Sequence, residues 1–142
     1  MSADKQAEAI VGKMMETDAF SQWLGIDVLD VKQGYCKLAM KVRPEMCNGF
    51  GITHGGITFS FADSALAFAS NGYGRQSVAL ECSISFPVAV KVDDEITAIA
   101  TEISLSYKIG IYTIEVRNQD SDLVASFKGM VYRTSKEWEV PT

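Results

Sequence analysis

One carboxylate stands in the middle of an apolar stretch of this chain. Asp63 lies between Gly56 and Ser70, where the side chains are apolar or small almost all the way round. A helix with that pattern is normally enclosed on every side. A charge inside it is costly unless it is paired or used, and Asp in a helix interior is a poor helix former. We therefore interpret Asp63 as part of a functional site; the alternative is a buried carboxylate bonded to Thr58, Ser60 or a loop amide.

Two glycines and the one histidine of the sequence stand where this helix begins. The first backbone N–H groups of a helix lack partners within it and lie at the positive end of its dipole. Such groups can stabilise negative charge growing on a substrate oxygen. Gly55 and Gly56 suit this role because a side chain there would block a bulky substrate. The alternatives are a tight turn for the glycines, a hydrogen-bonded loop residue for His54 and an ordinary turn for Asn48.

Spacing along the helix predicts how these groups can meet. Gly55 and Asp63 are eight residues apart, or roughly 12 Å at the rise of an α-helix. A base and an oxyanion donor must both come within about 3 Å of the reacting group. Two copies with their central helices side by side and antiparallel would bring the glycine end of one to the aspartate of the other. We therefore expect a site shared between two chains, with two sites in each dimer.

Composition bounds the class of protein. The chain has 142 residues, 47% hydrophobic and 22% charged, and a net charge of −5, which suits one domain over 1–142. Lysine and arginine are scattered rather than gathered in a stripe, so no nucleic-acid partner is expected. Three cysteines and one histidine do not make an ordinary zinc site or a disulfide framework. We expect no metal, no cofactor, no membrane partner and, without a signal-peptide core, a cytoplasmic protein.

The remaining pattern predicts the elements around the site. A helix is expected from about Ala3 to Phe20, then strands over Ile26–Lys32 and Tyr35–Val42, and after the central helix four strands. The expected ranges of those four are Ser77–Phe86, Glu95–Leu105, Ile111–Asn118 and Leu123–Thr134, and the tail from Ser135 is too poor in apolar residues to add an element. Consecutive strands with short turns favour an antiparallel sheet. The predicted class is α+β, with one sheet wrapped around one long helix and part of that helix left for a second copy to cover.

The same residues resemble a known family. The run HGGITFSFADSALAFASN, with Asn48 six residues ahead of its histidine, is similar to the hotdog-fold acyl-CoA thioesterases and most of all to their phenylacetic acid degradation branch. The similarity extends from DAFSQWLGIDVLDVKQGYCKLAMKV through IYTIEVRNQ to LVASFKGMVYR, which is nearly the whole chain.

The resemblance implies a hotdog fold and hydrolysis of an aryl or phenylacetyl-type acyl-CoA to a free acid and coenzyme A. It implies that Asp63 is the general base or nucleophile and that the Gly55 amide polarises the thioester carbonyl. His54 would support the loop, and Asn48 would orient the water or the target of the carboxylate. It also implies a homodimer that assembles to a homotetramer. By the same resemblance, the residues expected to hold the substrate are Gly56, Lys108 and Gly110.

The family pattern is not matched everywhere, and two other functions stay open. Ala79 stands where relatives commonly carry a serine or threonine thought to hold the attacking water. A hydratase or dehydratase on the same fold would need a histidine and an acid across the acyl chain. A non-catalytic acyl-CoA-binding protein would bind the ester without turnover.

Overall fold

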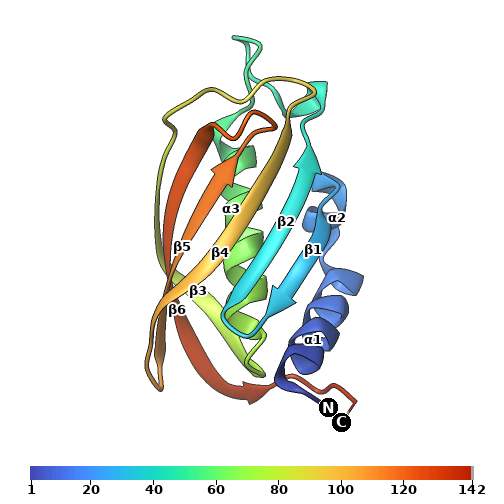
Figure 1. The fold of residues 1–142 in the computed structure, drawn as a ribbon, viewed down its shortest axis with the longest axis vertical. Coiled ribbons are helices and arrows are strands. Elements are labelled where there is room, and N and C mark those ends of the chain that lie inside the picture. Colours follow the sequence, from blue (N-terminus) through green and yellow to red (C-terminus); the bar gives the residue numbers. More distant parts are fainter. Residues whose placement is uncertain (142) are drawn as a thin grey trace.

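In the computed structural model, which describes residues 1–141, six strands form one antiparallel sheet that curves around a single long helix (Figure 1). The elements are, in chain order, α1 (Ala3–Thr17), α2 (Ala19–Leu24), β1 (Asp27–Lys32), β2 (Tyr35–Lys41), the short 3-10 turn η1 (Pro44–Met46), α3 (Gly55–Asn71), β3 (Arg75–Ser85), β4 (Glu95–Leu105), β5 (Ile109–Arg117) and β6 (Leu123–Glu137). The strand order across the sheet is β1-β2-β4-β5-β6-β3. The predicted α+β architecture, a sheet wrapped around one helix, is confirmed.

Helix α3 is held by the hydrophobic effect acting on a wide part of its surface. Its Phe61, Leu66 and Phe68 side chains are almost completely buried against the sheet, and each contributes about 1.5–3 kcal/mol by leaving water. The strands supply the other half of this core by alternation. In β2, Cys36, Leu38 and Met40 are buried while the residues between them are not, because successive side chains of a strand point to opposite faces.

The sheet has two edge strands, β1 and β3, and only β1 is covered by a helix that packs along it. Helix α1 packs along β1 and places Ala7, Ile10 and Val11 in the core. Strand β3 pairs with β6 on one side, and its other side pairs with no strand among residues 1–141. An unpaired strand edge presents free N–H and C=O groups to any chain that can pair with it.

The N-terminal helix ends earlier than predicted. Asp18 interrupts the expected helix from Ala3 to Phe20: it closes α1 and its carboxylate caps α2, accepting a hydrogen bond from the Ser21 amide at 3.0 Å. Aspartate is a strong N-cap and a weak interior residue, so the chain turns there.

The expectation that the tail adds nothing is also wrong. Strand β6 continues to Glu137, and the Trp138 indole then donates a hydrogen bond to Asn71 Oδ1 at 2.8 Å. Asn71 ends α3, is buried, and its Oδ1 also accepts from the Ser77 amide at 2.9 Å. A buried amide needs such partners, so the tail serves to close the C-terminal end of α3.

Two further findings concern the cysteines and the helices. The three cysteines are free thiols. Within residues 1–141, none of the helices has the length and apolar character that a bilayer span requires.

Close packing between α3 and β6 gives a test of this arrangement. A Cβ added to Gly129 would lie 2.5 Å from Leu66 Cδ2, and the buried leucine has little room to move. We expect Gly129→Ala to lower the free energy of unfolding by about 1–3 kcal/mol, measured by urea unfolding at fixed protein concentration. Gly12→Ala is the matched control, because a Cβ there meets nothing within 4 Å and alanine is the better helix former by about 0.5–1 kcal/mol. Equal stabilities of the two variants would contradict the packing described.

Candidate active site

The N-terminus of α3 has one amide that is occupied and one that is free. His54 is the N-cap, and its Nδ1 accepts a hydrogen bond from the Gly56 N–H at 3.1 Å. The Gly55 N–H donates to no acceptor within residues 1–141. Because Nδ1 is an acceptor here, the imidazole stands as a cap that orients the turn. The amide left to meet a ligand is that of Gly55.

A cavity of about 210 Å³ opens beside this amide. Its lining is Asn48, Ile52, Thr53, Gly55, Thr58, Phe86, Val88, Ala89, Val90 and Val124. A Cβ on Gly55 would lie 3.3 Å from the Phe86 ring, so glycine allows the close approach of the ring. Phe86 was not singled out from the sequence; an aromatic residue just after a strand and before Pro87 was the available signal.

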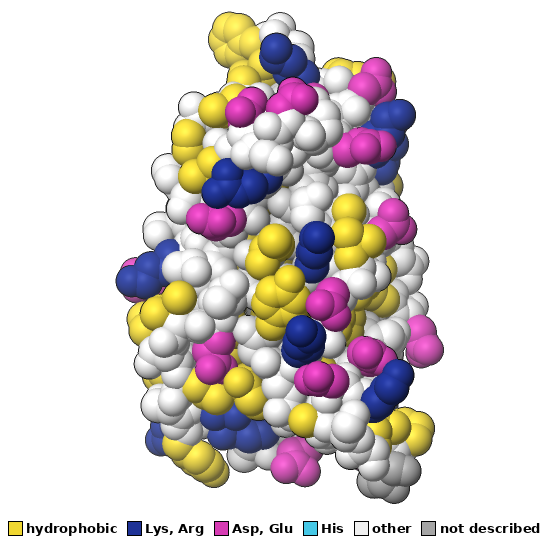
Figure 2. All heavy atoms as spheres, viewed as in Figure 1, with side chains coloured by type: hydrophobic (Ala, Val, Ile, Leu, Met, Phe, Trp, Pro, Cys, Tyr) yellow, Lys and Arg dark blue, Asp and Glu magenta, His cyan; other side chains and the backbone are white. Residues whose placement is uncertain are grey.

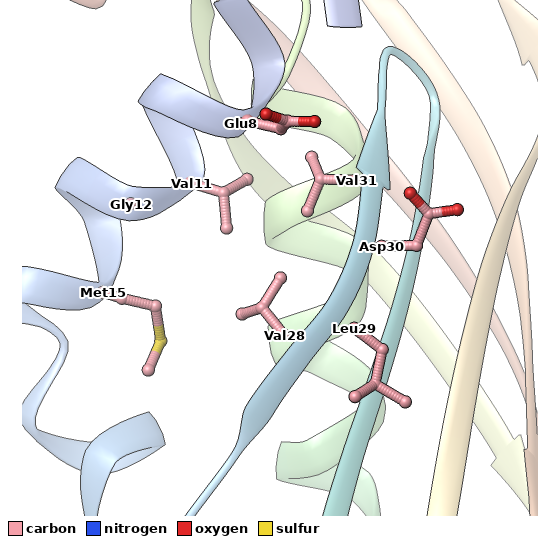
Figure 3. A pocket seen from close by; sticks show the side chains of 8 residues that line it. All are labelled: Glu8, Val11, Gly12, Met15, Val28, Leu29, Asp30 and Val31. Carbon is pink, nitrogen blue, oxygen red and sulfur yellow. The ribbon is translucent and has the colours of Figure 1, made fainter. Parts of the chain in front are cut away.

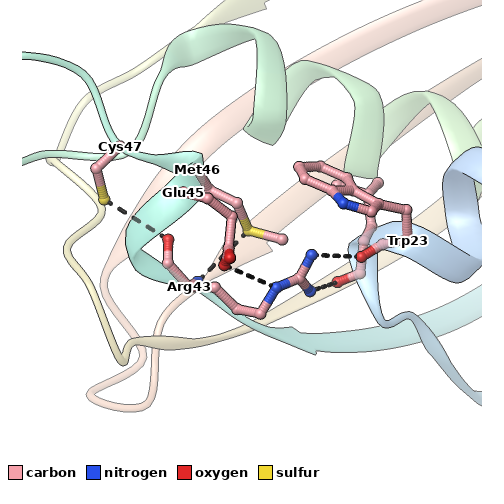
Figure 4. A network of polar contacts seen from close by, with 6 residues as sticks. Trp23, Arg43, Glu45, Met46 and Cys47 are labelled. Atoms are coloured by element: carbon pink, nitrogen blue, oxygen red, sulfur yellow. Dashed lines mark hydrogen bonds and ion pairs between the residues drawn. The ribbon is translucent and has the colours of Figure 1, made fainter.

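The loop that leads to His54 is fastened at two points. Asn48 Oδ1 accepts a hydrogen bond from the Phe50 amide at 2.9 Å. This bond forms a local turn, which is one of the two interpretations given for Asn48 from the sequence. Upstream, the Arg43 guanidinium binds the carbonyl oxygens of Trp23 and Leu24 at 2.5 and 3.2 Å, and lies 4.9 Å from the Trp23 ring centroid (Figure 4). Arg43 therefore ties the end of α2 to the start of the loop.

Asp63 lies halfway along α3 and accepts no hydrogen bond from residues 1–141. The partners considered from the sequence do not serve it, since the Ser60 hydroxyl donates instead to the Gly56 carbonyl at 2.7 Å. Burial raises the pKa of the Asp63 carboxyl above its ordinary value, and the negative charge of Asp18 raises it further. A carboxylate that is partly desolvated and unpartnered is typical of a functional group rather than a structural one.

The carboxylate of Asp63 faces the unpaired edge of the sheet. It lines a cavity of about 170 Å³ together with Leu66, Ala67, Ser70, Ser77, Val78, Ala79 and Val131. Ala79, where the family resemblance predicts a hydroxyl, thus lines the same cavity as Asp63. Burial raises the pKa of the Cys82 thiol of β3, and the Asp63 charge adds to the effect.

One stripe of α3 remains outside the sheet. Gly56, Ser60, Asp63 and Ala67 follow one another at helical spacing, and none of them is buried. Beside them, Val78 and Leu80 of β3 are each 56% exposed. Exposed apolar side chains next to a free strand edge and a helix face of small residues are typical of an interface.

A single chain does not bring all the predicted site residues together. Gly55 and Asp63 keep their eight-residue separation on α3. Lys108 lies past the opposite end of that helix, where its carbonyl accepts from the Arg133 amide at 2.7 Å and the neighbouring Tyr107 ring packs on Arg75. Gly110 is buried, and a Cβ there would lie 3.0 Å from the Tyr112 ring, so packing alone accounts for this glycine.

A larger cavity lies away from this chemistry. It has a volume of about 400 Å³ and opens between α1 and β1, where it is lined by Glu8, Val11, Gly12, Met15, Val28, Leu29, Asp30 and Val31 (Figure 3). It contains none of the predicted site residues. Across residues 1–141, no three His, Cys, Asp or Glu side chains are grouped so as to hold a metal ion.

Comparisons with known proteins agree on one family. A family model described as the thioesterase superfamily matches residues 50–125. The acyl-coenzyme A thioesterase PaaI of Escherichia coli K12 is 38% identical over 120 residues, which are 84% of this chain and 86% of that protein. A putative esterase of Archaeoglobus fulgidus is 36% identical over 134 residues, 94% of this chain and 87% of that protein. The structure of the E. coli PaaI protein from the phenylacetic acid degradation operon superposes with a TM-score of 0.94 at 35% identity, covering 96% of this chain and 99% of that one.

The unpartnered carboxylate predicts how stability depends on pH. A folded-state pKa above the ordinary value of 3.8 means that folding favours the protonated Asp63. The contribution of protonated Asp63 to the free energy of unfolding is therefore lost as pH rises through the folded pKa. We expect Asp63→Asn to unfold at higher urea concentration than the wild type near pH 8, and this advantage to vanish as pH falls toward about 4. A variant less stable than the wild type at both pH values would show that Asp63 has a stabilising partner.

Proposed function

The chain belongs to the thioesterase superfamily, and from this membership and the position of Asp63 we propose that it hydrolyses acyl-CoA thioesters to a free acid and coenzyme A. The observation that carries the proposal is the carboxylate itself, which is partly buried, without a hydrogen-bond partner in the described chain, and beside a cavity at the sheet edge. The hotdog fold expected from the resemblance is confirmed by the architecture and by the superposition on PaaI.

In this proposal each site residue has a separate task. Ionised Asp63 either removes a proton from the water that attacks the thioester carbonyl carbon or attacks that carbon itself. The C–S bond then breaks, and coenzyme A leaves as the thiol after protonation. Where Asp63 has itself attacked, water then hydrolyses the acyl–Asp63 anhydride, which releases the free acid and restores the carboxylate. The free Gly55 amide binds the oxygen on which negative charge grows. His54 keeps the helix turn in place, and Asn48 shapes the loop beside the reacting group.

We further propose that two chains build each site. The two tasks of Gly55 and Asp63 fall roughly 12 Å apart on one helix, whereas an antiparallel partner helix would place its own Gly55 at the level of Asp63. The stripe of Gly56, Ser60, Asp63 and Ala67 leaves room for such an approach. Pairing of β3 with its symmetry mate would cover Val78 and Leu80 and satisfy the free strand edge.

The proposed dimer would also bring the residues proposed to hold the substrate near the shared site. Lys108 and Gly110 of one chain lie toward the C-terminal end of its α3, and Gly56 of the partner would arrive from the other side of Asp63. Coenzyme A would then extend from the shared centre toward the Lys108 ammonium, which suits its phosphates.

Assembly beyond the dimer is proposed on the outer face of the sheet. Hydrophobic side chains stand among charges of both signs on the face turned away from α3 (Figure 2). Ile99, Ile103 and Tyr132 are among the exposed large hydrophobic residues of β4 and β6. Contact between two dimers through this face would give the homotetramer that the family resemblance implies.

An aryl or phenylacetyl-type acyl group is the substrate class we propose. The cavity beside Gly55 is walled mainly by apolar side chains, among them Phe86, Val88 and Val124. Its volume of about 210 Å³ suits one small ring better than a long chain. Among the similar proteins, E. coli PaaI is encoded in a phenylacetic acid degradation operon. The location of the protein in the cytoplasm stays a prediction.

Release of free thiol from a panel of acyl-CoAs tests the activity. The wild type should release coenzyme A, and Asp63→Asn should lower kcat by at least about 100-fold, because neither chemical route works without the carboxylate. Near-normal turnover by a folded Asp63→Asn protein would remove Asp63 from the mechanism. Water addition to the acyl chain without thiol release would indicate a hydratase, and tight binding without either reaction would indicate a binding protein.

Complementation tests the shared site. Asp63→Asn and Gly55→Val homodimers should each be nearly inactive, since both of their sites carry a lesion. A mixed dimer has one site with both lesions and one with neither. Mixing under conditions that exchange subunits should therefore restore up to about a quarter of wild-type activity, because about half of the dimers are mixed and each has one intact site.

The same mixture separates the alternatives. If both residues act within one chain, every site in every dimer keeps one lesion and no mixture recovers activity. A mixture of Asp63→Asn with itself, carried through the same exchange, is the control for activity gained by handling.

A further inference from the structure

Asp18 uses both of its carboxylate oxygens, and capping accounts for only one of them. Oδ1 accepts from the Ser21 amide at 3.0 Å, the ordinary bond of a helix N-cap. Oδ2 accepts from the Ser21 hydroxyl at 2.6 Å. A short bond to a charged acceptor is among the stronger hydrogen bonds in proteins, so the Ser21 hydroxyl is held in one orientation.

The hydrogen bonds continue from Ser21 to helix α3. Ser21 is 1% exposed, and its Oγ lies 2.8 Å from the Oγ of Ser64. Because the Ser21 proton is given to Asp18, the Ser64 hydroxyl is the donor in this second bond. Ser64 directly follows Asp63. A chain of hydrogen bonds therefore joins the α1–α2 junction to the turn of α3 that carries the proposed catalytic carboxylate.

Asp18 also brings a charge of the same sign to Asp63. Its charge is the second cause, after burial, of the raised pKa of Asp63. Neither carboxylate forms an ion pair with a Lys, Arg or His side chain of residues 1–141. On β3, the Asp63 charge acts on the Cys82 thiol. Glu81 of the same strand is exposed and also acts on Cys82. On the other strands around α3, the Cys36 thiol of β2 bonds the Ala65 carbonyl, and Glu102, Tyr112 and Arg133 of β4, β5 and β6 gather with Tyr73 past the helix end.

We propose that Asp18 is a positioning residue for the thioesterase reaction, acting through Ser21 and Ser64 to hold the Asp63 turn and placing a negative charge beside the catalytic carboxylate. The inference rests on the proposed function of Asp63. A neighbouring negative charge makes a carboxylate a stronger base, and a general base works best when its pKa lies close to the working pH. The chain of hydrogen bonds from Asp18 through Ser21 to Ser64, called the relay below, would also keep the Asp63 carboxylate from rotating away from the thioester.

The test is the pH profile of kcat/KM for thiol release by the full-length protein. Asp18→Asn and Asp18→Ser both remove the charge and both keep a good N-cap residue, so one of them can replace the other if either folds poorly. Removal of the charge lowers the pKa of Asp63, so the acidic limb of the profile should move to lower pH. The plateau value should fall about threefold to tenfold, because the base is weaker and less well held.

Two further variants separate charge from hydrogen bonding. Asp30→Asn removes an equal charge from an exposed position on β1 and should leave the limb in place. Ser64→Ala breaks the relay and keeps the Asp18 charge, so it should lower the plateau without moving the limb. An acidic limb that stays at the wild-type pH in both Asp18 variants, or that moves equally in Asp30→Asn, would overturn the proposal.

A second readout does not depend on turnover. The titration of the Asp63 carboxyl carbon by NMR, assigned with Asp63→Asn, should shift to lower pH in Asp18→Asn. If the wild type releases no thiol from any acyl-CoA, the proposed function fails, and this titration still decides whether Asp18 acts on Asp63. An unshifted titration overturns the proposal whatever the activity.

Discussion

The enclosure of α3 is the interaction on which the rest of the structure depends. Phe61, Leu66 and their neighbours cover a much wider arc of the helix than the single stripe of an ordinary surface helix. Only a surface that curves can cover such an arc, and a twisted antiparallel sheet supplies one. The order of the strands and the buried face of each follow from this need. The buried apolar residues of β2, β4, β5 and β6 pack around the same helix.

A curved sheet that ends at two edges leaves one side of the helix open. That side is where α3 has its small residues and its one carboxylate, Asp63, so the candidate site lies at the open side of the helix rather than in a closed core. Asp63 is buried enough for its pKa to be raised, and it lines a cavity through which a substrate could reach it. Electrostatic effects grow as water is excluded, which is why covering of this open side by a second chain would strengthen the chemistry as well as the fold.

Much of the fold could be predicted because its signals are local. The alternation from Tyr35 to Val42 gave β2 to within one residue, and the predicted strand Glu95–Leu105 coincides with β4. The central helix differs from its predicted core by one residue at each end. Two errors occurred at polar groups, one a local helix cap and the other a bond between distant segments. Asp18 was placed inside a helix that it actually ends, and the tail was dismissed although Trp138 bonds Asn71 across 67 positions.

The sequence by itself singled out Asp63, Gly55 and Gly56 as candidates for the site, because a charge in an apolar helix and glycines at its start are recognisable from their neighbours. Only the tertiary structure decided which of these groups are free to act. It shows that the amide of Gly56 is taken by His54, that the amide of Gly55 is not, and that Asp63 has no hydrogen-bond partner in the described chain. It also joins Ser21 to Ser64, which are 43 positions apart. Local periodicity reports which face of an element is buried, whereas a hydrogen bond between distant segments depends on how the whole chain packs.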